Sequence, residues 1–104
     1  MPRKPARLSD DQATELAEMF RLMGDQSRLR IILACLDAPA AVGEIAERLG
    51  LSASLVSHHL RLLRAARILR AARRGKQVFY GAADAHIRRM LVDMAEHVGE
   101  ASGA

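Results

Sequence analysis

Residues 54–69, SLVSHHLRLLRAARIL, carry the pattern that decides the fold. A helix that starts after an N-cap at Ser52 and ends near Ala65 has two different sides, at about 100° per residue. The apolar side, which would face a core, contains Val56, His59, Leu60 and Leu63. The other side carries small polar and basic groups: Ser54, Ser57, His58 and Arg61. The stretch therefore predicts an amphipathic helix whose polar side is free to bind a partner.

A shorter helix is predicted directly upstream, over residues 42–49, because Gly50 is a residue that commonly ends helices. Two helices joined by a tight turn, the second presenting polar groups, form a helix-turn-helix, here residues 42–65. Serine hydroxyls allow close approach to a phosphate, and His58 and Arg61 can reach base edges. We therefore expect DNA contacts from Ser52, Ser54, Ser57, His58 and Arg61. The alternative is an ordinary amphipathic surface helix.

A β-hairpin is predicted to follow, over residues 68–81, with RRGKQVFY at 73–80. Residues 68–72 and 77–81 would form the strands, and the glycine-containing segment between them would form the turn. A hairpin placed after a helix-turn-helix is a wing, which contacts phosphates or the minor groove. The cations expected to do so are Arg73, Arg74 and Lys76.

The distribution of charge along the chain is stronger evidence for a polyanionic partner than the net charge of +4. No acidic residue occurs between Arg48 and Ala83. That segment contains the cations Arg48, Arg61, Arg64, Arg67, Arg70, Arg73, Arg74 and Lys76. The alternative is a solvated basic face without a partner.

The length of 104 residues fits one domain, and only 3% of the residues are aromatic, which favours a mainly helical core. A first helix is expected from a capping box at Ser9 and Gln12 to Met23, after a mobile arm over residues 1–8. A second is expected after Asp25 or Ser27, ending before Pro39. No apolar run approaches the ~20 residues of a membrane span, so we expect a cytoplasmic protein. Cys35, the single cysteine, is expected to be a small buried hydrophobe.

Four side chains of the types that bind a borderline divalent metal lie on or next to the last predicted helix, residues 84–98: Asp84, His86, His97 and Glu100. At ~1.5 Å per residue, His86 and His97 lie roughly 16 Å apart along the helix, too far to share one ion. Around the helix axis, however, His97 lies within roughly 20° of His86, because eleven residues make about three full turns. Glu100 lies about 40° from His86 in the opposite direction. One helix cannot close this site, but two antiparallel copies in a homodimer could.

The donor set, two imidazoles and two carboxylates, favours Zn²⁺, with Co²⁺ as a surrogate. The apolar stripe of the same helix could be core or could be the seam of the dimer; it contains Ile87, Met90, Leu91, Met94 and Val98. We expect a mainly α winged helix-turn-helix that dimerises through its terminal helices.

Several segments together resemble the ArsR/SmtB family of small dimeric metal-sensing repressors. They are GDQSRLRIIL at 24–33, the stretch 54–69, the stretch 73–80, and Asp84-x-His86 followed by His97-x-x-Glu100. The last pair of motifs resembles the C-terminal-helix site of the zinc-responsive members. The resemblance implies a tetrahedral site between subunits, two per dimer, whose filling weakens operator binding.

Two departures from the family pattern matter. Residues 40–43 and the N-terminal arm contain no cysteine, which argues against a thiolate sensor of arsenite, cadmium or lead. Ala66 is expected to stand where the family usually has glycine after the recognition helix. Three alternatives stay open: a constitutive DNA-binding protein, a zinc hydrolase, and a dimer with a purely structural zinc. The hydrolase is disfavoured because no general base is evident beyond the proposed ligands, so we do not expect an enzyme.

Overall fold

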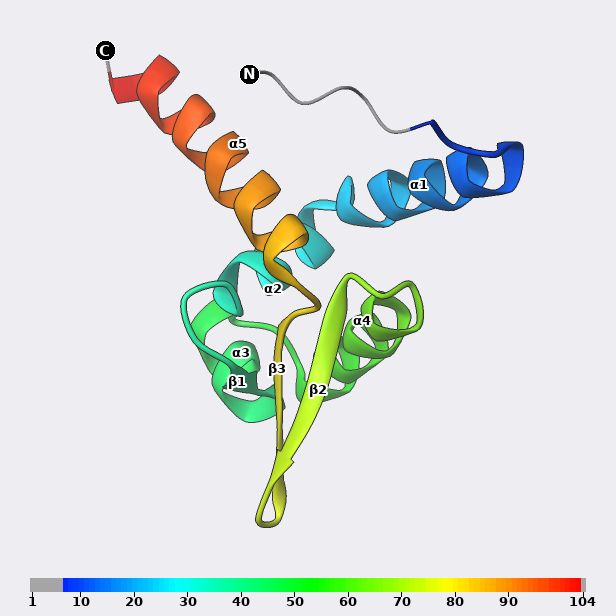
Figure 1. Ribbon diagram of the computed structural model, residues 1–104. Helices are drawn as coiled ribbons and strands as arrows, with labels where there is room; N and C mark the ends of the chain where they lie inside the picture. Colours follow the sequence, from blue (N-terminus) through cyan, green and yellow to red (C-terminus); the bar gives the residue numbers. More distant parts are fainter. Residues whose placement is uncertain (1–6, 104) are drawn as a thin grey trace.

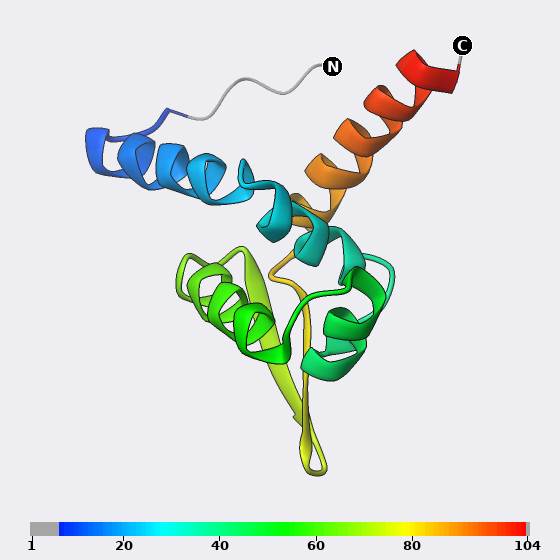
Figure 2. The same ribbon diagram turned by 180° about the vertical axis from the view of Figure 1, so that it is seen from behind.

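Three helices, α2, α3 and α4, surround a core beside a three-stranded antiparallel sheet, and two further helices, α1 and α5, extend away from this body (Figures 1 and 2). The computed structural model describes residues 7–103. The elements are α1 Asp10–Met23, α2 Gln26–Ala34, β1 Ala40–Ala41, α3 Val42–Leu49, α4 Ala53–Ala65, β2 Leu69–Arg74, β3 Gln77–Ala82 and α5 Ala85–Gly103. Most of the predicted arm, residues 1–6, lies outside the described residues.

The helix starts follow the capping signals of the sequence. The Ser9 hydroxyl accepts from the Gln12 amide at 3.1 Å, and the Gln12 side chain accepts from the Ser9 amide at 3.0 Å, so the predicted capping box is present. Asp25 caps α2 by accepting from the Arg28 amide. Gly50, with a φ of 67°, ends α3 in the left-handed region that glycine adopts most readily.

The predicted core side of α4 is buried. Val56, Leu60 and Leu63 have no exposed surface, and His59 is 9% exposed. They pack with Ile31 and Ile45 of α2 and α3 in one apolar cluster. Burial of this side leaves the polar side of α4 at the surface, as the helical periodicity predicts.

The sheet is larger than the predicted hairpin. β2 continues through Arg73 and Arg74, which were predicted as turn, and β3 starts at Gln77 as predicted. The turn itself consists of Gly75 and Lys76, with a φ of 62° at the glycine. A positive φ at the first turn position suits a two-residue hairpin turn and favours glycine there. The order β1-β3-β2 includes a strand that was not expected, in which Ala40 pairs with Tyr80 and Ala41 with Phe79.

The exit from α4 corrects one expectation. Ala66 has a negative φ of −84°, which any residue adopts, and the left-handed residue is Arg67, with φ 61°. The glycine-like position is therefore Arg67, and the conformation costs about 1–2 kcal/mol relative to glycine. The Arg67 guanidinium also donates to the Glu15 carboxylate of α1, so the exit of α4 is tied to the first helix.

The terminal helix α5 also runs further than expected, to Gly103 rather than to about Val98. Its apolar stripe divides in two: Leu91 is buried against the core, whereas Met94 is 54% exposed. On α1, Leu16 and Phe20 are 41% and 52% exposed. Large apolar side chains thus remain uncovered on α1 and α5, the two helices that extend from the body in Figure 1. No helix within the described part of the chain is long and apolar enough to cross a membrane.

Candidate nucleic-acid interface and metal centre

The polar side of α4 presents the groups predicted to contact DNA. Ser54, His58 and Arg61 are exposed and Ser57 is half-buried. Ser52 lies just outside the helix, where its Oγ accepts from the Leu55 amide at 3.1 Å. The hydroxyl of Ser52 therefore caps α4 and keeps its own O–H as a donor.

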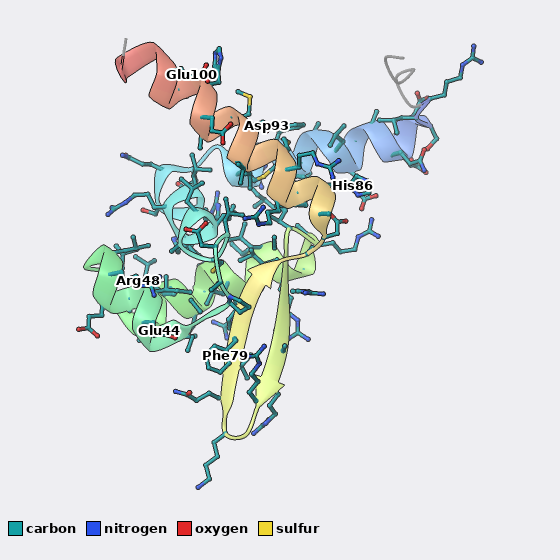
Figure 3. All side chains as sticks on the ribbon, turned by 60° about the vertical axis from the view of Figure 1, so that its left-hand side comes forward. Glu44, Arg48, Phe79, His86, Asp93 and Glu100 are labelled. Carbon is teal, nitrogen blue, oxygen red and sulfur yellow. The ribbon has the colours of Figure 1, made fainter. Side chains whose placement is uncertain are left out.

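The wing cations lie on different faces of the hairpin. Neighbouring residues of a strand point to opposite faces, and Arg73 pairs with Val78 whereas Arg74 pairs with Gln77. Arg74 stacks over the Phe79 ring, with its guanidinium carbon 5.8 Å from the ring centroid, on the face away from the core (Figure 3). Arg73 belongs to the face of Leu69, which packs into the core against α4. The hairpin thus places Arg73, and not Arg74, on the side of the recognition helix.

The described residues contain no cluster of three or more histidine, cysteine, aspartate or glutamate side chains that could hold a metal ion. The four predicted ligands instead form two pairs on one helix. Asp84 and His86 lie at the start of α5, next to the sheet, and Glu100 lies near its far end (Figure 3). His97 belongs to the same exposed end. One chain therefore supplies two separated pairs of donors, as the spacing predicts.

The first pair is already organised. Asp84 Oδ1 accepts from the Ile87 amide at 3.0 Å and lies 3.7 Å from His86 Nδ1. The hydrogen bond from Ile87 is the main cause that lowers the pKa of Asp84, so this carboxylate is ionised, the form that binds metal. Capping uses only one carboxylate oxygen, and the exposed side chain leaves the other accessible. Asp84 can therefore cap α5 and bind a metal at once.

This pair also adjoins the recognition helix. Asp84 and His86 line a groove of about 610 Å³. Opposite them, its walls include Arg64 and Arg67 at the end of α4 and Met19 of α1. The start of α5 therefore shares one groove with the segment where α4 ends.

Two further titratable groups are buried outside these sites. Burial raises the pKa of the Cys35 thiol to about 11, so it stays protonated and is a poor metal ligand at neutral pH. Burial is also the main cause that lowers the pKa of His59, and its Nδ1 atom has no hydrogen-bond partner. His59 is thus a neutral packing residue of α4.

Comparison with known proteins identifies the family. The family model described as bacterial regulatory protein, arsR family, matches residues 25–71. The HTH-type transcriptional regulator KmtR of Mycobacterium tuberculosis is 38% identical over 98 residues, which cover 91% of this chain and 75% of that protein. The chain belongs to the arsR family. The transcriptional repressor SmtB homolog of Synechocystis is 37% identical over 97 residues, covering 93% of this chain and 74% of that protein.

Solved structures agree with this assignment. The antimony-specific transcriptional repressor AntR superposes with a TM-score of 0.79 at 28% identity, covering 98% of this chain and 93% of AntR. The solution structure of apo-NmtR superposes with a TM-score of 0.75 at 29% identity, covering 96% of this chain and 84% of NmtR. The chain is a winged helix-turn-helix member of a family of metal-sensing repressors, and its relatives are regulators rather than enzymes.

Proposed function

We propose that this repressor responds to Zn²⁺. Members of the family bind operator DNA as homodimers, and this chain does the same. In the proposed mechanism the metal-free dimer occupies a two-fold-symmetric operator, and zinc bound between the subunits weakens that complex. The observation that carries the proposal is the placement of Asp84 and His86 at the start of α5 and of His97 and Glu100 near its end. By helical periodicity His86, His97 and Glu100 fall on one face. The protein would work in the cytoplasm, where a bacterial operator is found.

The surface of α5 supports an antiparallel pairing of two such helices. Met94 of α5 is a large apolar side chain exposed to water, as are Leu16 and Phe20 of α1. A second copy of the chain would bury such side chains in a dimer interface. The first turns of α5 carry the cations Arg88 and Arg89, and the anions Asp93, Glu96 and Glu100 follow from near its middle onward. Antiparallel helices place opposite charges together, whereas parallel helices would place like charges together. The same orientation brings the Asp84 pair of one chain to the His97 pair of its partner.

The donor chemistry supports zinc over softer metals. Two imidazoles and two carboxylates fit a tetrahedral Zn²⁺ or Co²⁺ site. One solved relative is named a cadmium metal-sensor, and another is antimony-specific. Thiolates select soft metals, and here the single cysteine is buried with a raised pKa. Both proposed donor pairs, Asp84 with His86 and His97 with Glu100, are exposed, so an ion can reach them.

The groove beside Asp84 connects the proposed metal site with the end of the recognition helix. A bound metal would join the start of one α5 to the end of the other. Because the Asp84 pair shares its groove with Arg64 and Arg67, this clamp would change the placement of the α4 exit. Recognition helices that no longer match successive major grooves bind the operator less tightly.

A zinc titration tests the proposal. Fluorescence anisotropy measures the affinity of the dimer for a labelled duplex from the DNA adjoining its own gene, at fixed salt, with and without Zn²⁺. An allosteric coupling of ~1–3 kcal/mol predicts an affinity about 5- to 150-fold weaker with zinc. Unchanged affinity, with zinc demonstrably bound, would reject the regulatory role and favour a constitutive DNA-binding protein.

The two faces of the wing give a further prediction. Arg73→Ala should reduce the slope of log affinity against log salt by about 0.9 for each phosphate that the protein no longer neutralises, hence by about two for a dimer with two wings. Arg74→Ala is the matched control, because its guanidinium stacks on Phe79 on the other face, and it should leave the slope unchanged. Equal slopes for the two variants would contradict this placement. The measurement is anisotropy over a series of salt concentrations.

A further inference from the structure

Two exposed leucines lie on the recognition helix beside its polar residues. Leu55 is 40% exposed and Leu62 is 36% exposed. They are seven residues apart, so both fall on the same flank of α4, within roughly 20° of each other. Leu55 lies about 60° from His58 around the helix axis. An apolar flank thus borders the side of α4 that carries the predicted DNA contacts.

Leu55 belongs to the first turn of α4, and Leu62 to the last. The N-terminal turn of a recognition helix is the part that approaches base edges, whereas the later turns move away from them. At ~1.5 Å per residue the two leucines are separated by about 10 Å along the axis. The Ser52 hydroxyl accepts from the Leu55 amide, which holds this first turn in place. Of the two leucines, only Leu55 lies where a base can be reached.

We propose that Leu55 contacts the C5-methyl group of a thymine and so determines one base of each half-site. This inference rests on the proposed DNA-binding function. The thymine methyl is the one apolar group on the major-groove edges of the base pairs. The predicted contacts Ser54, Ser57, His58 and Arg61 all offer hydrogen-bonding groups, so they do not account for an exposed leucine among them. Contact with the methyl would cover apolar surface that the folded chain leaves in water.

Methyl deletion in the DNA tests this contact. The metal-free wild-type protein first selects a duplex from a random-sequence library. Each symmetric pair of thymines in that duplex is then replaced by deoxyuridine, which lacks only the methyl group. Anisotropy at fixed salt measures the affinity of wild type, Leu55→Ala and Leu62→Ala for every duplex. Leu62→Ala is the matched control, since it removes a similarly exposed leucine from the same flank.

At one thymine pair, loss of the methyls should weaken wild-type binding by about fourfold per half-site, the value for one methylene-sized group. Leu55→Ala should bind the thymine and uracil duplexes equally, and Leu62→Ala should behave as wild type. The inference is overturned if Leu55→Ala keeps the wild-type response to uracil, or if no thymine pair responds in wild type. Either result with an intact zinc response leaves the proposed function standing. Failure to select any duplex would reject DNA binding itself, and the inference with it.

Discussion

Met94→Asp is expected to convert the dimer into monomers at micromolar concentration and to lower operator affinity by two to three orders of magnitude. Met94 is 54% exposed on the part of α5 that extends from the body. In the antiparallel pairing two copies of the new carboxylate would be buried, and each uncompensated buried charge costs several kcal/mol. A monomer contacts a single half-site and loses the contribution of the second recognition helix.

Sedimentation equilibrium measures the dimer dissociation constant, and circular dichroism checks that the chain stays folded. Met94→Leu, which keeps the apolar surface, should remain dimeric. Because Met94 lies outside the buried core, the aspartate should leave the helical content of the monomer unchanged. A Met94→Asp protein that stays dimeric with wild-type affinity would show that the interface lies elsewhere on the molecule.

His97→Ala is expected to abolish the response to zinc while leaving metal-free operator affinity within about twofold of wild type. The substitution removes one of four ligands from each proposed site and touches no residue of the DNA interface. The 5- to 150-fold effect of zinc expected for wild type should therefore shrink to less than about twofold. The reciprocal effect must vanish too, since operator DNA can weaken zinc binding only by the same coupling free energy.

The matched control is Glu96→Gln, a neutralising change next to His97 at a position outside the proposed ligand set. It should keep the zinc response, which anisotropy titrations of both variants compare directly. If His97→Ala loses DNA binding as well as the zinc response, His97 has a structural role instead. If it keeps the full response, the site does not include His97.

The amphipathic elements could be predicted from local sequence because their signals are local. The core side of α4 and the caps at Ser9, Asp25 and Ser52 follow from periodicity and from side chains that accept from nearby amides. Strand β1 could not be predicted, because two alanines have no β-propensity and pair only with the distant Phe79 and Tyr80. The true end of α5 differs from the prediction because Gly99 is typical of a helix end, although the helix continues through it.

The backbone conformation of single residues also could not be predicted from the sequence. The left-handed residue after α4 is Arg67, an amino acid that gives no signal for positive φ. The basic cluster at the wing was predicted as one group, but strand pairing separates Arg73 from Arg74. The separation of the four predicted metal ligands into two pairs, by contrast, follows from helix rise alone, which is why spacing was enough to predict it.

If the two pairs form the proposed site between subunits, the sensitivity of the repressor to zinc would depend on the concentration of the protein. A site assembled from two chains exists only in the fraction of protein that has associated, so the zinc concentration giving half-response rises when the protein becomes scarce. A repressor that limits its own synthesis would then set its own detection threshold. Dilution alone should shift the zinc dose–response curve, whereas a site contained within one chain would respond at the same free zinc concentration at every protein level.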